Sequence, residues 1–468
     1  MDIDVKKSKI KMEFSIKKKE ELKDLSYEEL LEYVENLTDN IVQEKPRKHS
    51  NNSSIPPSQD PNRKKKKKKN QSLRPKSDRK PGGQPGHVGV TLRQSDQPDE
   101  TVRIPFTLDR CQQCGSDLDA TLAVLKEKRQ VLDLDLQNIQ AQIREYQSFA
   151  KVCPVCGHAN HDNAFPHDVA PHISYGINLQ ALVSYLNVSH YLSYGRIVQL
   201  LSTLFGIHLS EGTVDNLLKR ASQAAEGEIA RIKERLALSK VIGIDETGCN
   251  INAERHWNWV FQNGEDTLIV VDKSRGRKVI NETFDAGFVD ACVVHDNYAS
   301  YSGLVAQEEQ LCLAHKLRDL NYAIECDDTQ VMKDIKQLLK EAMNDHKETM
   351  SPAGHRFLLK QQYEATLDHL LAQPVIPGSE THKQINSFTK ARNKIFTFLL
   401  HPNIPPDNNG SEQAIRNVKV KLNVSGQFKS RQGAEDYARL RSIIDTSRKR
   451  GVNEFGALVK VVNRKNVF

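Results

Sequence analysis

The sequence predicts an α/β protein in which helices accompany a mixed sheet. Short apolar runs with the length of strands follow one another between residues 241 and 296, with one helical stretch among them. Segments of helical periodicity lie on both sides of this region, at about 178–237 and 321–400. Three adjacent strands, a helix and a further strand fit a mixed sheet with helices.

Four apolar runs predict the strands of this sheet. The first is Val241–Ile251, and the sequences HWNWVFQ and DTLIVVDKSRG follow it. GRKVINETF then predicts a helix, and ACVVHD predicts the fourth strand. Apolar runs of this length, bounded by turn residues, are typical of buried strands.

Three acidic residues stand where predicted elements begin or end. Asp245 follows the apolar run VIGI, Asp296 ends ACVVHD, and Glu412 opens a helical stretch. A hard cation such as Mg²⁺ takes oxygen ligands, and a rigid sheet holds carboxylates in place for it. Each residue alone is explained equally well as a turn residue or a first-turn helix charge. Their joint occurrence favours a shared metal site.

Composition limits the protein class. A chain of 468 residues is expected to form two to four domains. We find no run of 18 apolar residues and no signal peptide, which predicts a soluble cytoplasmic protein without membrane contact. Eight cysteines are too few for a disulfide scaffold, and half of them stand in two C-x-x-C pairs.

Positive charge is concentrated in residues 46–93, expected to be a disordered linker rich in Asn, Ser, Pro and Gly. Residues 45–93 hold fifteen Lys or Arg and two Asp, whereas the whole chain has a formal charge of +7. Such an arm suits a polyanion such as DNA, although a solvated charge run is the simpler alternative. Its densest part is Lys64, Lys65, Lys66, Lys67, Lys68 and Lys69.

The two cysteine pairs predict one structural Zn²⁺ bound by four thiolates in residues 94–170. They are separated by more residues than is usual, but RQVLDLDL and AQIREYQSFAKV alternate like a strand pair that could bring them together. Three nearby histidines, at positions 158, 161 and 167, are candidate substitute ligands. The predicted ligands are Cys111, Cys114, Cys153 and Cys156.

Two helical segments precede the predicted sheet. Ser26 and Glu29 form a capping box for a helix in residues 1–45, which could pair with another copy or pack on its own chain. In residues 171–237, two helices separated by a turn at Gly206, the second capped by Ser210, are compatible with a helix-turn-helix. The same pattern is common in helical scaffolds, so a role in DNA reading stays open.

Six sequence blocks resemble those of a known family. VIGIDETG, VVHDNYASY, LCLAHKLRDL and PPDNNGSEQAIRNVKVKLNVSGQFKSRQGAE are preceded by NSSIPPSQD and RKPGGQPGHVGVTL. Their order and spacing are similar to the signature blocks of the bacterial insertion-sequence transposases of family 66. The resemblance implies a ribonuclease-H-like core with an α-helical insertion, preceded by a zinc-knuckle domain and a helical segment. The core is expected in residues 238–320 and 401–468, with the insertion at 321–400.

The resemblance also implies a catalytic triad, made of Asp245, Asp296 and Glu412. These residues would hold two Mg²⁺ or Mn²⁺ ions for in-line phosphoryl transfer, with water first freeing a 3′-hydroxyl that then attacks target DNA. Adjacent side chains of a strand point to opposite faces, and the resemblance selects Asp245 over Glu246.

Further residues are expected to assist this chemistry. Cys312 and His315 are interpreted as support for the site and not as a second zinc centre, because only two soft ligands occur there. Four basic residues near the third carboxylate are candidates for contacts with the DNA backbone, although solvated surface charge explains each nearly as well. They are Arg416, Lys419, Lys421 and Arg431.

The function predicted on this basis is that of a metal-dependent transposase. Its expected partners are double-stranded DNA at transposon ends and targets, a second copy of the chain in a homodimer or higher oligomer, and accessory proteins of the same element. When bound to DNA it would be associated with the bacterial nucleoid. The alternatives are a non-catalytic zinc-containing DNA-binding protein derived from a transposase, and a metal-dependent nuclease without strand transfer.

Overall fold

A computed structural model describes the two main parts of the chain, residues 175–348 and 353–468, together with short pieces before them. Those pieces are residues 26–32, 48–49, 52, 96–97, 113–117, 141, 143, 150–152, 154, 156 and 159–161. The chain divides into two compact units. The first is Met1–Arg63, Pro166–Ile197 and Ser210–Phe468, and the second is Lys64–Phe165 and Val198–Leu209. None of the described helices is long and apolar enough to cross a membrane.

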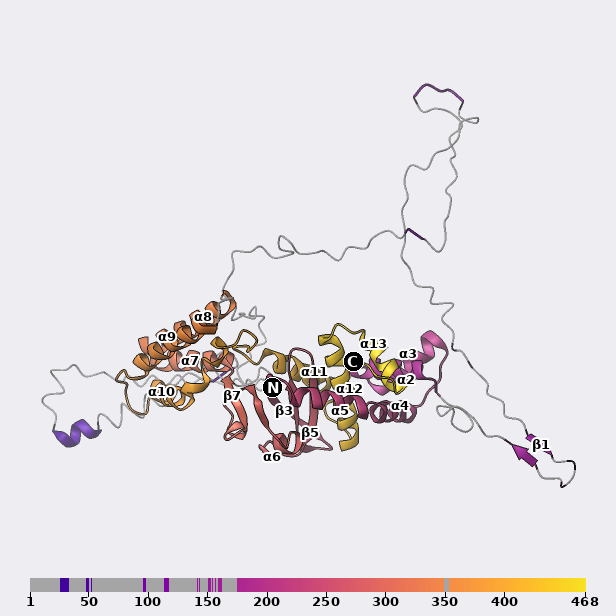
Figure 1. Cartoon of the computed structure of the whole chain (residues 1–468), viewed down its shortest axis with the longest axis horizontal. Helices are drawn as coiled ribbons and strands as arrows, with labels where there is room; N and C mark the ends of the chain where they lie inside the picture. Colours follow the sequence, from indigo (N-terminus) through magenta and orange to yellow (C-terminus); the bar gives the residue numbers. More distant parts are fainter. Residues whose placement is uncertain are drawn as a thin grey trace, which may run out of the picture. The chain divides into compact units, whose positions relative to one another are not determined.

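A five-stranded mixed sheet with the order β5-β4-β3-β6-β7 belongs to the first unit (Figure 1). The first three strands in sequence form an antiparallel meander, and β6 and β7 extend the sheet in parallel from β3. This topology is compatible with a ribonuclease-H-like core. The strands are β3 (Val241–Ile251), β4 (Glu254–Gln262), β5 (Thr267–Asp272), β6 (Phe288–His295) and β7 (Ala306–Leu311).

The predicted strands β3 to β6 are confirmed, as is the helix α6 (Lys278–Thr283) between β5 and β6. Of the five strands of this sheet, only β7 was not predicted. Its sequence AQEEQL contains no apolar run, and burial is restricted to Gln310 and Leu311 at its end. As an edge strand it meets a single partner, so a largely polar sequence is tolerated.

The opposite edge of the sheet is covered by α12 (Arg431–Lys449). The backbone N–H groups of Thr267 and Ile269 in β5 donate to the hydroxyls of Thr446 and Ser442, at 3.0 and 2.9 Å. Buried backbone donors at a sheet edge need such partners. The hydroxyl groups of α12 thus accept hydrogen bonds from backbone N–H groups of β5 that have no strand partner at this edge.

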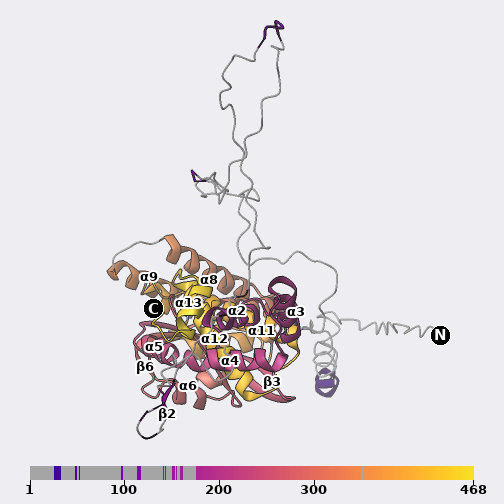
Figure 2. The same ribbon diagram turned by 90° about the vertical axis from the view of Figure 1, so that its right-hand side faces the viewer.

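Within residues 175–468, four helices precede the sheet, and one follows α12. The predicted two-helix pattern is present: α3 ends at Phe205, Gly206 has a φ of +63°, and the Ser210 hydroxyl accepts the N–H of Thr213 at the start of α4. Figure 2 shows α2, α4, α12 and α13 gathered together. The helices are α2 (Ile177–Val188), α3 (Tyr194–Phe205), α4 (Glu211–Ala224), α5 (Glu226–Ala237) and α13 (Glu454–Val462).

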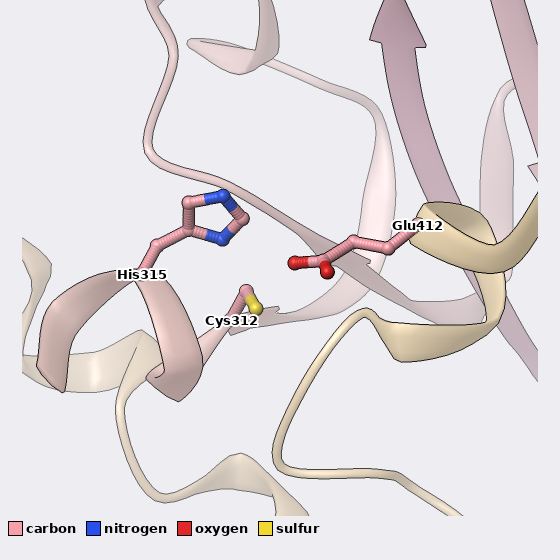
Figure 3. A group of neighbouring side chains, drawn as sticks. All are labelled: Cys312, His315 and Glu412. Carbon is pink, nitrogen blue, oxygen red and sulfur yellow. The ribbon is translucent and has the colours of Figure 1, made fainter. Parts of the chain in front are cut away.

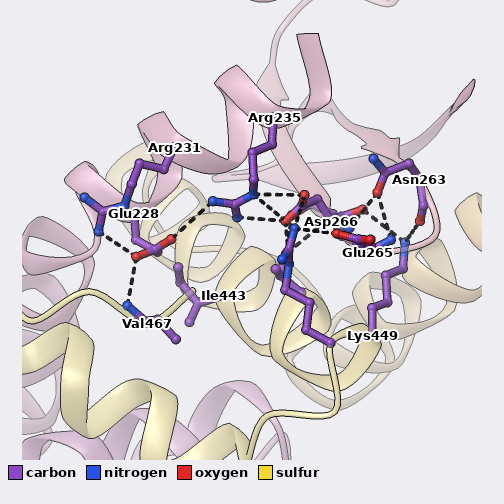
Figure 4. A network of polar contacts seen from close by, with 12 residues as sticks. Glu228, Arg231, Arg235, Asn263, Glu265, Asp266, Ile443, Lys449 and Val467 are labelled. Carbon is purple, nitrogen blue, oxygen red and sulfur yellow. Dashed lines mark hydrogen bonds and ion pairs between the residues drawn. The ribbon is translucent and has the colours of Figure 1, made fainter. Parts of the chain in front are cut away.

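A polar network joins α5, the turn before β5 and the end of α12 (Figure 4). Arg235 and Arg450 both donate to the Asp266 carboxylate, each with a contact at 2.8 Å. Burial raises the pKa of Asp266, but the two guanidinium groups outweigh this and hold it below its ordinary value. Nearby, the Lys449 ammonium donates to Gln262 Oε1 and to the carbonyl of Asn263, both at 2.7 Å.

A helical segment lies between β7 and α11 (Asn409–Ser425), where an insertion was predicted. Its apolar residues, which include Met332, Ile335, Leu339, Leu367 and Phe388, form one buried cluster with Cys292 and Val294 of β6 and Leu311 of β7. Its elements are α7 (Leu313–Asp327), α8 (Gln330–Glu348), α9 (Ala353–Leu371), α10 (Glu380–Ala391), and the 3₁₀ turns η2 (Arg392–Lys394) and η3 (Thr397–Leu399). A further turn, η1 (Ala299–Tyr301), follows β6.

The described pieces near the N-terminus bear on three expectations. The capping box is confirmed: the Ser26 N–H donates to Glu29 at 2.8 Å, and the Glu29 N–H donates to the Ser26 hydroxyl at 3.3 Å. Asn52, in the predicted linker, is buried and its amide donates to Glu325 of α7 at 2.5 Å. In the second unit, β1 (Ala150–Val152), the end of the predicted strand AQIREYQSFAKV, pairs in antiparallel fashion with β2 (Ala159–His161), which was not predicted. Its expected partner RQVLDLDL lies outside the described residues.

Candidate active site

Asp245 and Asp296 come from neighbouring parallel strands. Gly243 of β3 pairs with Val294 of β6, and each carboxylate lies two residues further along the chain. Neighbouring strands are about 4.8 Å apart, so the register places the two acids beside one another where β6 ends. One oxygen of Asp296 accepts the N–H of Tyr298 at 2.9 Å, which fixes the turn that follows.

The three predicted acids share one electrostatic environment. Burial raises the pKa of Asp245 well above its ordinary value, and the charges of Asp296, Glu246 and Glu412 raise it further. The Glu246 N–H, which donates to Asp245 Oδ1 at 2.8 Å, acts in the opposite direction. Like charges gathered in a poorly solvated place are costly unless a proton or a cation neutralises them.

Asn408 connects the segment that carries Glu412 to the rest of the site. Its side-chain amide donates to the carbonyl of Ile244 at 2.8 Å, and its backbone N–H donates to the Cys312 sulfur at 3.2 Å. The Ser411 hydroxyl donates to the Asn408 side-chain oxygen at 2.7 Å. Asn408 occupies the N-cap position of α11, but its side chain makes no capping hydrogen bond and holds the strand of Asp245 instead.

Two glycines permit this close approach of α11 to the sheet. A Cβ atom on Gly243 would lie 2.7 Å from Asn408 Oδ1 and 2.9 Å from the Ser411 hydroxyl. A Cβ atom on Gly410 would lie 2.6 Å from Gln262 Oε1. Without these glycines the first turn of α11, and Glu412 with it, could not lie so near β3.

Cys312 and His315, at the start of α7, lie beside Glu412 of α11 (Figure 3). Their ligand atoms and those of Glu412 are all within 4.8 Å of one another. Burial raises the pKa of the Cys312 thiol to about 12. Burial lowers the pKa of His315, and Arg318 lowers it further, although Asp296 and Glu412 oppose this.

Glu246 has different surroundings from its neighbour Asp245. Its carboxylate accepts a hydrogen bond from Arg275 Nε at 2.8 Å and another from the buried Tyr301 hydroxyl. Arg275 also stacks on the rings of Trp257 and Tyr298. Glu246 is therefore satisfied by the protein itself.

Cationic side chains surround the third carboxylate. Arg318 and Arg416 each approach Glu412 to 3.6 Å, and the Arg416 side chain is 70% exposed. Lys419 feels the charges of Asp245 and Glu412, but burial outweighs them and lowers its pKa. These three cations thus gather on one side of the site, close to the third carboxylate.

The other two basic candidates lie in different settings. Lys421 is only 9% exposed and its ammonium lies over the ring of Tyr437, so it has little surface to offer DNA. Arg431 is exposed and pairs with Glu435 at 2.8 Å. Lys64–Lys69, Cys111 and Cys153 lie outside the described residues, and Cys114 and Cys156 are exposed.

Several residues of the site were not predicted, namely Arg318, Asn408, Arg275 and Tyr301. Only Arg318 gave a local signal, because it lies three residues after His315 and so on the same face of a helix. The contacts of the others join segments far apart in sequence.

Comparison with known proteins agrees with this geometry. The five-stranded mixed sheet with its clustered carboxylates is compatible with the ribonuclease-H-like fold, and this sets the class of protein. A model of the Transposase IS66 family matches residues 172–436, more than half of the chain, and this range contains all three acids. The chain belongs to this transposase family, whose members act on DNA. No curated protein matches the sequence.

Proposed function

We propose that this protein cleaves DNA at transposon ends and joins the freed ends to target DNA, with Asp245, Asp296 and Glu412 as its catalytic residues. The observation that carries this proposal is the convergence of these acids from β3, the end of β6 and α11. Family membership supports the reaction class, and the convergence of the acids supports the choice of residues.

The site fits divalent cations. Glu412 Oε1 is buried and has no hydrogen-bond partner among the described residues. Burial raises the pKa of Asp245, and the charges of Asp296 and Glu412 raise it further. Oxygen ligands that repel each other in this way suit Mg²⁺ or Mn²⁺. Two such ions, when bound, stabilise negative charge on the attacking and leaving oxygens of phosphoryl transfer.

The protein's own groups hold this arrangement in place. Asp245 and Asp296 are fixed by strand register, and Asn408 fixes the first turn of α11 against β3. Arg318 and Arg416 can exchange their contacts with Glu412 for contacts with a DNA phosphate, because both lie 3.6 Å away and one is well exposed. Lys419 adds positive charge on the same side.

The N-terminal part would serve DNA binding. Lys64–Lys69 and their neighbours would neutralise phosphates independently of sequence. Cys111, Cys114, Cys153 and Cys156 would hold one Zn²⁺. The pairing of β1 with β2 on either side of the second cysteine pair supports this proposal. Assembly into dimers on DNA, and a need for accessory proteins, remain predictions.

The decisive experiment supplies purified protein with DNA that carries the ends of its element and with Mg²⁺. Cleavage at the ends followed by joining to a second DNA supports the transposase. Cleavage without joining would identify a nuclease. Binding of the ends without any cleavage, in wild type and triad variants alike, would identify a DNA-binding protein on a transposase scaffold.

A further inference from the structure

Cys312, His315 and Glu412 bring a sulfur, a nitrogen and an oxygen ligand together at one point (Figure 3). Only two soft ligands could be recognised here in the sequence, which favoured a purely supporting role. The fold adds the missing ligand from α11, a segment distant in sequence from α7.

Two of these three groups have a buried atom that makes no hydrogen bond among the described residues, although Arg318 Nη2 lies 3.6 Å from Glu412 Oε1. His315 Nδ1 and Glu412 Oε1 are both inaccessible to solvent and accept or donate no hydrogen bond among the described residues. Figure 3 shows the imidazole and the carboxylate reaching toward each other, with the Cys312 side chain beside them. Buried polar atoms without partners cost free energy, so their gathering here points to a ligand between them.

We propose that Cys312, His315 and Glu412 form a binding site for a borderline-soft divalent cation such as Zn²⁺, separate from the four-cysteine cluster. Thiolate, imidazole and carboxylate are the ligands that Zn²⁺ takes, whereas Mg²⁺ avoids sulfur. Bond lengths of about 2.0–2.3 Å put ligand atoms of a tetrahedral site about 3.5 Å apart. The observed separations, all within 4.8 Å, need to close by only about 1 Å.

The surroundings of Cys312 suit a metal-bound thiolate. Its sulfur accepts the backbone N–H of Asn408 at 3.2 Å, and Cys312 occupies the N-cap position of α7. Backbone donors and a helix N-terminus both stabilise negative charge on sulfur. Three protein ligands leave a fourth position open for water or another small ligand.

The test measures zinc bound to the full chain, by equilibrium dialysis and metal analysis without DNA. Wild type should bind one zinc ion more than Cys312→Ser does. Cys292→Ser, which changes another buried cysteine outside the cluster, should keep the wild-type content. The four-cysteine cluster is counted separately, because Cys153→Ser should lose a different ion and leave the Cys312 site filled.

Two substitutions in the triad test whether Glu412, and not Asp245, is a zinc ligand. Glu412→Gln should weaken the zinc affinity of this site by more than about tenfold, whereas Asp245→Asn should leave it unchanged. Equal zinc content in wild type, Cys312→Ser and a second variant, His315→Asn, with folding verified by circular dichroism, would overturn the proposal. So would loss of this zinc in Asp245→Asn but not in Cys312→Ser.

This inference shares Glu412 with the proposed catalytic site, but its test does not depend on catalysis. If no zinc binds at Cys312, the proposal that the protein cleaves DNA is not affected. If the protein does not cleave DNA, the proposal of a zinc site is not affected.

Discussion

Arg275 Nε lies 2.8 Å from Glu246 Oε1, so the residue next to Asp245 is neutralised by the protein itself. The Glu246 side chain is 1% exposed, and the Tyr301 hydroxyl donates to its second oxygen. Asp245 has no such cation and is surrounded by other acids. One of two adjacent carboxylates is thus paired with a cation, whereas the other lies among acids and is the one we propose as a metal ligand.

Glu246→Gln is therefore expected to affect stability more than cleavage. It replaces a buried charged acceptor of Arg275 and should lower the free energy of unfolding by about 1–3 kcal/mol, measured by denaturant titration. Glu254→Gln is the matched control, because its pair with Lys273 is exposed on both sides and should matter by less than about 1 kcal/mol. A Glu246→Gln variant that is fully stable but cannot cleave would assign the ligand role to the wrong acid.

Asn408 is expected to couple the strand of Asp245 to the helix of Glu412. Asn408→Ala should lower stability by about 1–3 kcal/mol, since the buried Ile244 carbonyl loses its donor, and should also reduce cleavage at temperatures where the variant is folded. Asn408→Asp keeps the size and the acceptor for Ser411 but cannot donate to Ile244. Wild-type cleavage by both variants would show that Glu412 is positioned without this contact.

The sequence predicted the features of this site that depend on neighbouring residues, but not those that depend on contacts between segments distant in sequence. Strands β3 to β6 were predicted because each carries an apolar run, whereas β7 is a polar edge strand without one. Asp296 and Glu412 were found because they stand at element ends; Asp245 was expected where a strand ends but lies in the middle of β3 (Val241–Ile251), because the strand continues past the apolar run VIGI. The partners of these acids were not found, because the contact of Asn408 with Ile244, or of Cys312 with Glu412, depends on how distant segments pack.

Lys449 should make stability depend on pH. Burial lowers its pKa from 10.5 to about 8, so folding favours the neutral amine. Its contribution is fully present above the ordinary pKa of 10.5 and is lost as the pH falls through about 8. Relative to Lys449→Gln, wild type should gain about 1–3 kcal/mol between pH 7.5 and pH 10, measured by urea unfolding. A difference that is independent of pH would show that the ammonium form is equally well accommodated.

The basic arm should dominate the salt dependence of DNA binding. Removal of residues 46–93 is expected to weaken affinity and flatten the plot of log affinity against log salt, because fewer counterions are released. A chain with Lys64–Lys69 changed to Gln retains the arm's length and should reduce the slope by up to about 5. An unchanged slope in both would assign the phosphate contacts to the folded part, where Arg318, Arg416 and Lys419 lie.

The central claim is that Asp245, Asp296 and Glu412 act as one metal-binding unit in DNA cleavage. The most direct measurement compares Mg²⁺-dependent nicking of end-bearing DNA by wild type, Asp245→Asn, Asp296→Asn and Glu412→Gln, with Glu246→Gln as the neighbouring control. Each triad variant should lose at least about a thousandfold in rate, because residues that act as a unit fail together, while DNA-end binding is retained. Wild-type rates in all three triad variants would contradict the catalytic assignment.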